Sequence, residues 1–372
     1  MKKKILFLAL TIILIASIVT PAAAAVSGSD PAGTLTASVS AEVQFPLSII
    51  FDITAQGGAV ITDIRLHYTV AYYKLANIIS EEYISFTPGK EATTRYTMDL
   101  RQTGGLPPGS QMTYWVTAKD ADGAVMETLP QNLDIKDERY GWKTLKEGMI
   151  SLYWYNGNNS FAQELMGAAQ TALGRLAENT GAALKNPVSL FIYANSSDLR
   201  NALIFSQDWT GGVAFSEFGI IAIGISTAQL DWGKRAISHE LTHLVVYQAT
   251  QNPYNGTPSW LDEGLAMFSE GDLEYQFSSA LEDAENSGTL ISVQSLSSPF
   301  SAYANQAVLA YAESYGIVNY LIDEYGREKM FELLNIYREG AGYDEALKTV
   351  YGFNMQSLNT QWQAALKTIL VP

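Results

Sequence analysis

The 372-residue chain contains no cysteine. This absence excludes a disulfide framework, a thiol nucleophile, an iron–sulfur cluster and a zinc ribbon. Basic residues are scarce, because 23 Lys and Arg stand against 38 Asp and Glu and the formal net charge is −15. Nucleic acids and anionic membranes bind basic protein surfaces, so this balance argues against both as partners. The remaining composition, with 47% hydrophobic and 16% charged residues, is that of a folded protein.

One long apolar run occurs, and it lies at the N-terminus. Three lysines at positions 2–4 precede the run over residues 5–19, and four alanines at 22–25 follow it with A-x-A cleavage sites. We interpret residues 1–25 as a signal peptide that is cleaved on export, and expect a secreted chain without a stable membrane anchor. A retained N-terminal anchor is the alternative, but the run is shorter than the ~20 residues that span a bilayer.

Apolar and polar residues alternate along the chain from about residue 33 to residue 135. The stretches 64–70 and 112–118 have a two-residue period, which is typical of half-buried strands. Turn-forming clusters separate such stretches at 56–58, 103–105, 107–109 and 120–123. About seven strands in ~100 residues predict a β-sandwich domain over residues 30–136. Its Leu-Pro-Pro-Gly-Ser run before a Tyr-bearing strand resembles fibronectin type III-like or Ig-like modules.

The pattern changes after residue 139. Helical spacing of apolar residues begins at Phe161, and from Asp231 to the C-terminus the sequence is almost wholly helical in pattern. Short strands are predicted at 150–154, 188–193, 212–215 and 220–223. Strands followed by helices predict an α+β domain over residues 140–372, with a small mixed sheet and a helical C-terminal part.

A HELTH sequence occupies residues 239–243 of the helical region. Residues four apart lie on one face of a helix with Cβ atoms ~5–6 Å apart, so His239 and His243 can bind one metal ion. Glu240 is then placed to take a proton from metal-bound water. A chance match on a helix is the alternative, although two of the three histidines fall in this motif. We expect the third, His67, on the solvent-facing side of a strand.

A catalytic zinc site usually has three protein ligands and one open position. Because cysteine is absent and His67 is remote, we expect the third ligand to be a carboxylate. Glu263 is the candidate, since Ser259 and Asp262 form a capping-box pattern that predicts a second helix at this point. A loop over residues 252–256 lets that helix fold back against the first. The alternative is a solvated carboxylate near a helix N-terminus.

These residues resemble the gluzincin metallopeptidases, also called the peptidase MA-like superfamily. The His-Glu-x-x-His motif is followed after nineteen residues by Glu263 within Trp-Leu-Asp-Glu-Gly-Leu-Ala. The spacing resembles thermolysin-like enzymes, and the words around Glu263 resemble aminopeptidase N-like enzymes. The resemblance covers about residues 140–372. It implies one Zn²⁺ ion per chain, with His239, His243 and Glu263 as ligands and Glu240 as general base.

Two further residues have possible roles at such a site. The run from Tyr311 to Leu321 resembles a helix of aminopeptidase N-like enzymes that begins with a catalytic tyrosine. The resemblance implies that Tyr311 donates a hydrogen bond to the developing oxyanion, and plain core packing at helical spacing is the alternative. Glu270 lies two helical turns after Glu263 and could orient a ligating histidine, or be an ordinary exposed carboxylate.

The strand predicted at 212–215 resembles the gluzincin edge strand that pairs with the substrate backbone. It lacks the Gly-x-Met-Glu-Asn sequence by which aminopeptidase N-like enzymes hold a free amino terminus. The sequence therefore predicts a secreted zinc peptidase acting on peptides or proteins, with an endopeptidase favoured over an aminopeptidase. Two alternatives stay open, an extracellular binding or adhesion protein with an inactive zincin scaffold and a metal-dependent hydrolase of non-peptide amides. No oligomeric state is predicted.

Overall fold

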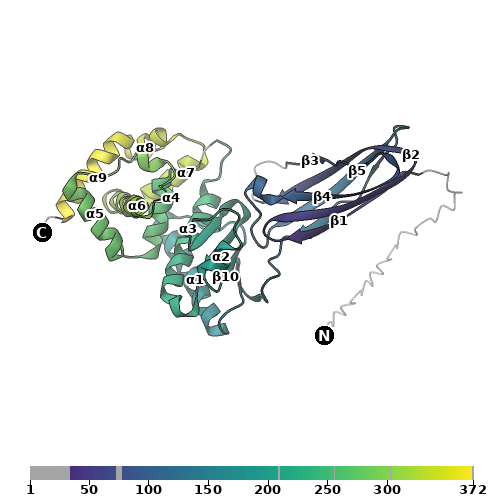
Figure 1. Ribbon diagram of the computed structural model, residues 1–372. Helices are drawn as coiled ribbons and strands as arrows, with labels where there is room; N and C mark the ends of the chain where they lie inside the picture. The colour runs from purple at the N-terminus through teal and green to yellow at the C-terminus, as the bar shows by residue number, and fades with distance from the viewer. Residues whose placement is uncertain (1–33, 73–77, 208–209, 255, 302, 371–372) are drawn as a thin grey trace, which may run out of the picture.

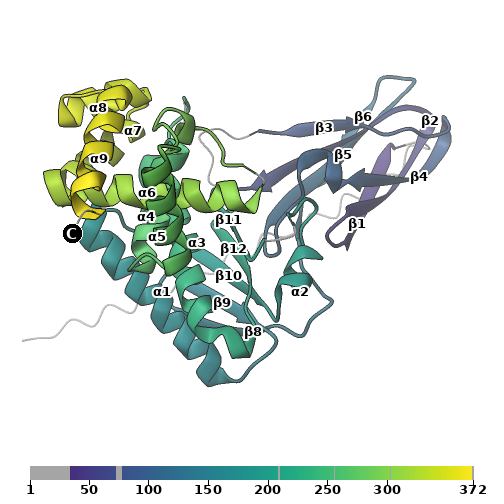
Figure 2. The same ribbon diagram turned by 60° about the vertical axis from the view of Figure 1, so that its left-hand side comes forward.

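The computed structural model describes residues 34–370 except 73–77, 208–209, 255 and 302, with side chains described up to residue 366. The predicted signal peptide at 1–25 lies outside this part of the chain. Strands β1–β5 form one end of the molecule and the C-terminal helices the other, with a second sheet between them (Figures 1 and 2). Within the described residues, no helix has the length and apolar character needed to cross a bilayer.

The N-terminal strands form one antiparallel sheet that is organised by a single long strand, β2. Its first half pairs with β1 and β4, its second half pairs with β3 and β5, and the register is irregular between Gln56 and Ile61. Strands β6 and β7 extend the sheet beyond β5. The strands are β1 (Thr36–Gln44), β2 (Ser48–Ala71), β3 (Ser80–Tyr83), β4 (Gly89–Asp99), β5 (Gln111–Asp120), β6 (Val125–Glu127) and β7 (Gln131–Asp134).

The two-residue period of the sequence is visible in the burial of this sheet. Ile49, Phe51 and Ile53 of β2 are fully buried, while the residues between them are partly or fully exposed. Because a strand directs alternate side chains to opposite faces, this pattern buries one face of the sheet. The strand-rich N-terminal region is thus confirmed, and β2 makes it one connected sheet; the sandwich arrangement and the boundary at residue 136 stay predictions.

His67 differs from its expected position facing solvent. Its ring stacks on Trp115 at a centroid distance of 5.4 Å, and Nε2 shares a 2.8 Å hydrogen bond with Thr117 Oγ1. Only 15% of its side chain is exposed, because β5 covers it with the indole. His67 therefore has partners within the N-terminal sheet, and it is not part of the group of possible metal ligands that the described residues form.

The second sheet is small and mixed, which confirms the predicted α+β class. Its order is β11-β12-β10-β9-β8, with β9, β10 and β12 parallel and the two edge strands antiparallel. The short β11 forms one edge of this sheet and lines the cleft that contains His239 and His243. The strands are β8 (Lys143–Glu147), β9 (Ile150–Trp154), β10 (Val188–Tyr193), β11 (Gly212–Phe215) and β12 (Ile220–Gly224).

Helices cover this sheet and form the C-terminal part (Figure 2). Leu190 and Ile223 of the sheet share one core with α1 and α3, while Tyr193 on the opposite face packs near α2. Helix α4 lies against α6 at Gly264, where a Cβ would collide with the carbonyl oxygen of Ser314. The helices are α1 (Asn159–Thr180), α2 (Ser196–Arg200), α3 (Leu230–Thr250), α4 (Ser259–Glu270), α5 (Tyr275–Ser287), α6 (Ala304–Tyr325), α7 (Arg327–Arg338), α8 (Tyr343–Tyr351) and α9 (Met355–Leu370).

One carboxyl group, that of Glu313 in α6, is buried inside the helical part. Its Oε1 accepts a 2.8 Å hydrogen bond from the backbone N–H of Ile291, and its Oε2 has no hydrogen-bond partner. Burial raises the pKa of Glu313 to about 8, and the hydrogen bond from Ile291 only partly opposes this rise. The folded protein therefore keeps this side chain protonated at neutral pH, whereas the unfolded chain ionises it.

This difference predicts a pH-dependent stability that Glu313→Gln removes. Between about pH 5 and pH 8 the folded state binds a proton that the unfolded state has lost, so wild-type stability falls as pH rises. Relative to Glu313→Gln, the wild-type free energy of unfolding is expected to fall by about 1.4 kcal/mol per pH unit in that window. Urea denaturation at several pH values measures this slope. Glu324→Gln, at an exposed position of the same helix, is the control, and equal slopes for both variants would contradict the prediction.

Candidate metal centre

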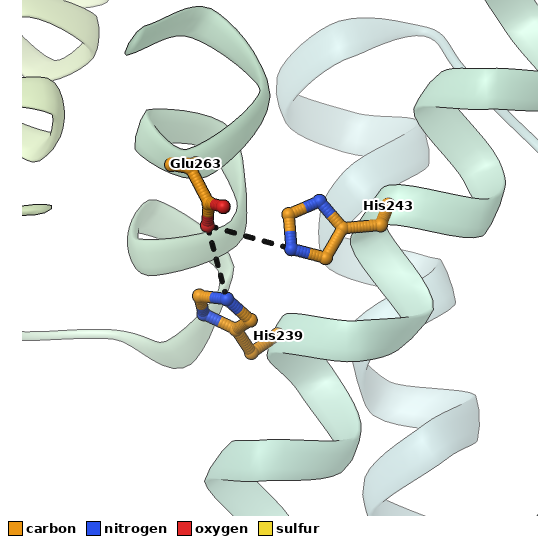
Figure 3. Close-up of side chains that lie close together, drawn as sticks. All are labelled: His239, His243 and Glu263. Carbon is orange, nitrogen blue, oxygen red and sulfur yellow. Dashed lines mark ion pairs between the residues drawn. The ribbon is translucent and has the colours of Figure 1, made fainter. Parts of the chain in front are cut away.

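Helices α3 and α4 bring His239, His243 and Glu263 together (Figure 3). Glu263 Oε2 lies 3.3 Å from His239 Nε2 and 3.5 Å from His243 Nε2. One potential ligand atom from each residue lies within 4.8 Å of the other two. The two histidines are one turn apart on α3, and Glu263 is on the first turns of the antiparallel neighbour α4. The predicted spacing thus produces one convergent group of three side chains.

The start of α4 differs in one detail from the predicted capping box. Pro258 is the N-terminal capping residue and Ser259 is already helical, so Ser259 makes no side-chain cap. The backbone carbonyl of Pro258 accepts instead from the N–H groups of Leu261 and Asp262. Proline suits this position because it has no N–H to lose and because its fixed φ favours a helix start. The helix still begins at Ser259, as the sequence predicts, and Glu263 lies near its start.

The donor set fits a zinc ion. Two imidazole nitrogens and one carboxylate oxygen are ligands that zinc takes at catalytic sites, which keep a fourth position open. Glu263 Oε2 is buried and has no hydrogen-bond partner in the described part of the chain, although it lies beside both Nε2 atoms. Its two ion-pair contacts, at 3.3 and 3.5 Å, are longer than good hydrogen bonds, and a cation between the three side chains would satisfy this buried oxygen more fully.

The electrostatics of the group also favour a cation. Burial opposes charge on His243, but Asp262 and Glu263 outweigh this effect and raise its pKa to about 9. Burial likewise opposes charge on His239, yet Glu263 and Glu270 hold its pKa well above the ordinary value. For Glu263, the two histidines outweigh burial and lower the pKa. Carboxylates that attract protons to these imidazoles in the metal-free protein will attract a dication to the same place.

A further carboxylate contacts the Nδ1 atom of each histidine. His239 Nδ1 lies 2.8 Å from Glu270 Oε1, and His243 Nδ1 lies 3.0 Å from Asp262 Oδ2. A carboxylate at Nδ1 favours the tautomer with the proton on Nδ1, which leaves the Nε2 lone pair free for a metal. The sequence indicated Glu270 as a possible partner of a ligating histidine. The contact of Asp262 with His243 was not predicted, because the only signal for it is the position of Asp262 beside Glu263 in the first turn of α4.

Glu240 lies between the metal centre and the edge strand β11. A Cβ at Gly212 of β11 would lie 2.5 Å from Glu240 Oε1, so the close approach of strand and carboxylate requires glycine there. Burial raises the pKa of Glu240, and the charges of His239 and His243 partly oppose this rise. Glu240 is thus a carboxylate beside the group of three with a pKa shifted toward neutrality.

Tyr311 faces the same cleft, which is the place that the resemblance implied. Its ring meets the His239 ring edge-on at a centroid distance of 6.2 Å, and the Phe300 ring also packs against it, at a centroid distance of 5.3 Å. Burial raises the pKa of Tyr311, so its hydroxyl keeps its proton at neutral pH. The cleft has a volume of about 720 Å³ and is lined by residues of β11, α3, α4, α5 and α6.

Known proteins similar to this chain include one family and several solved structures. The family model of the peptidase MA superfamily matches residues 168–368, which is more than half of the chain. An M1 zinc metallopeptidase from Deinococcus radiodurans is 14% identical, with 88% of this chain and 92% of that chain covered and a TM-score of 0.35. Legionella pneumophila aminopeptidase A in complex with aspartic acid is 12% identical, with 85% of this chain and 47% of that chain covered and a TM-score of 0.41. No curated protein matches the chain in sequence.

Proposed function

Because the chain belongs to the peptidase MA superfamily, we propose that it is a secreted zinc-dependent endopeptidase with one zinc ion per chain. The observation that carries this proposal is the convergence of His239 and His243 on the buried carboxylate oxygen of Glu263, with Glu240 in the same cleft. The predicted signal peptide supports export. A peptide or protein is the proposed substrate, and the cleft beside β11 is its proposed binding site.

The roles of the residues follow from their places in the cleft. When bound, zinc would lower the pKa of a water molecule and polarise the scissile carbonyl group. Glu240 would take a proton from the attacking water and deliver it to the leaving amine, a task for which a carboxylate with a raised pKa is suited. Tyr311 would donate its hydroxyl hydrogen bond to the developing oxyanion. The edge strand β11 would pair with the backbone of the substrate.

An endopeptidase is favoured by the state of the carboxylates that line the cleft. An aminopeptidase needs a carboxylate that is free to bind the ammonium group of its substrate. In the described cleft, Asp262 is engaged by His243, while Glu270 and Glu274 are both engaged by Arg235. The remaining two are the proposed base and the proposed ligand, and β11 itself carries no acidic residue.

Internally quenched peptides with an acetylated amino terminus test this proposal. We expect the mature protein to cleave them at internal bonds, to lose this activity when a chelator removes zinc, and to regain it with about one equivalent of zinc. Aminoacyl amides with a free amino terminus are the matched substrates. Cleavage of these substrates alone would overturn the proposal of an endopeptidase. Zinc binding without cleavage of any peptide would overturn the proposal of a peptidase. Amino-terminal sequencing of the exported protein tests secretion, with residue 26 expected first.

A further inference from the structure

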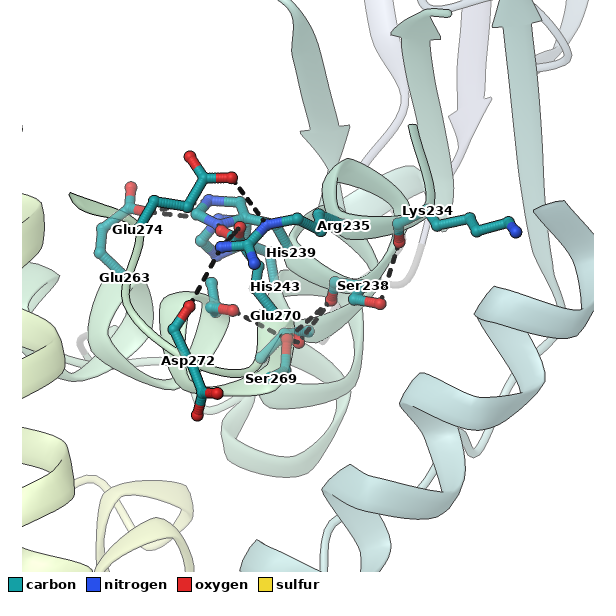
Figure 4. Close-up of polar contacts among 12 residues, drawn as sticks. Lys234, Arg235, Ser238, His239, His243, Glu263, Ser269, Glu270, Asp272 and Glu274 are labelled. Carbon is teal, nitrogen blue, oxygen red and sulfur yellow. Dashed lines mark hydrogen bonds and ion pairs between the residues drawn. The ribbon is translucent and has the colours of Figure 1, made fainter. Parts of the chain in front are cut away.

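Arg235 links α3, the helix that carries His239 and His243, to the end of α4. It lies one turn before His239 on α3, so both side chains project toward the C-terminal end of α4 (Figure 4). Arg235 Nη2 lies 3.2 Å from Glu270 Oε2, and Nε lies 3.3 Å from Glu274 Oε1. Nη2 also donates a 3.4 Å hydrogen bond to the backbone carbonyl of Asp272. One guanidinium group on α3 thus contacts the end of α4 and the segment that leads into α5.

Glu270 is held by two partners, one at each carboxylate oxygen. Its Oε1 lies 2.8 Å from His239 Nδ1, and its Oε2 faces the guanidinium of Arg235. Only 14% of the Glu270 side chain is exposed, so its negative charge needs a nearby cation to offset the loss of water. Two contacts at opposite oxygens also fix the rotation of the carboxylate plane, which a single contact would leave free.

We propose that Arg235 is a positioning residue of the metal centre that acts through Glu270. By holding Glu270 Oε2, it keeps Oε1 on His239 Nδ1 and so keeps His239 Nε2 directed at Glu263. The inference rests on the proposed function, because it takes His239 as a zinc ligand. Partners that orient a ligating histidine typically contribute a 10–100-fold factor in metal affinity, and the effect of Arg235 must pass through such a partner.

A different role for Arg235 follows from its place in the cleft wall. It lines the cleft beside the metal centre, so a free arginine there could bind a carboxylate of the substrate. Its Nε and Nη2 atoms are, however, already engaged by two carboxylates and a carbonyl oxygen. This occupancy favours positioning. A substrate-binding role would raise KM and leave the zinc affinity unchanged, so the two roles give different results.

The first experiment measures zinc affinity by chelator competition in Arg235→Gln, Arg235→Lys and a control. The control is Lys234→Gln, because Lys234 is the adjacent basic residue of α3 and pairs with Glu164 of α1 at 2.6 Å. We expect about tenfold weaker zinc binding for Arg235→Gln and less than a twofold change for the control. Arg235→Lys keeps the charge but not the planar fork, so its affinity should be intermediate. The cobalt-substituted Arg235→Gln protein should also show a changed visible spectrum.

A double-mutant cycle with Glu270→Gln decides whether Arg235 acts through Glu270. If it does, Arg235→Gln should cost less than twofold in zinc affinity once Glu270 is already replaced. An equal cost in both backgrounds would overturn the inference, as would a raised KM with wild-type zinc affinity. Circular dichroism of each metal-free variant controls for folding. Zinc affinity and the cobalt spectrum need no turnover, so a protein that binds zinc but cleaves no peptide would refute the proposed function and leave this inference intact.

Discussion

Glu240→Gln is expected to lower kcat/KM by about 10³-fold while the protein retains its zinc. A general base contributes typically 10²–10⁴-fold, and here the same carboxylate must also return the proton to the leaving amine. Glutamine has nearly the same shape as glutamate, so its side chain should fit against Gly212, where the strand backbone lies close to the carboxylate of Glu240. It cannot accept the proton from water. Turnover should therefore be lost without a change in the ligand set.

Two further measurements test whether Glu240 acts as the base and not as a zinc ligand. Elemental analysis of Glu240→Gln should find the same zinc content as the wild type, because Glu240 is not among the three converging side chains. Tyr311→Phe serves as the comparison, since it removes one hydrogen-bond donor and should cost about 10²-fold in kcat. A Glu240→Gln protein with full activity would refute the mechanism. Full activity in Tyr311→Phe alone would reduce Tyr311 to a packing residue against Phe300.

The core of the site was predictable because its signals are local. A four-residue spacing on a helix places His239 and His243 on one face whatever the rest of the fold does. Glu263 needed one further step, a second helix that returns alongside the first, and the loop before Ser259 supplied that signal. The α+β class followed equally from the change of period near residue 139. In each case the pattern in the sequence determines which face of an element is buried.

The supporting contacts were less accessible because they depend on how two helices are packed. Asp262 reaches His243 only because α4 is rotated so that adjacent carboxylates point to different atoms of the site. Arg235 reaches Glu270 across 35 residues of sequence, and no periodicity links the two. In the N-terminal sheet, the sequence predicts a turn at Gln56 and the two glycines after it, and so two separate strands. The structure instead has one strand, β2, that continues through this point with an irregular register.

Glu263→Ala is expected to weaken zinc binding by well over 100-fold, which is more than any partner behind the histidines should cost. The variant removes one of three ligand atoms, and it also removes the charge that, with Asp262, raises the pKa of His243 to about 9. The second effect gives a readout without metal, since an NMR titration of the metal-free variant should show that pKa lowered. Asp262→Asn is the matched control on the same turn of α4. It keeps all three ligand atoms and should cost about 10–100-fold in zinc affinity. If Glu263→Ala bound zinc as tightly as Asp262→Asn, Glu263 would be a charged neighbour of the histidines and the third ligand would have to come from elsewhere.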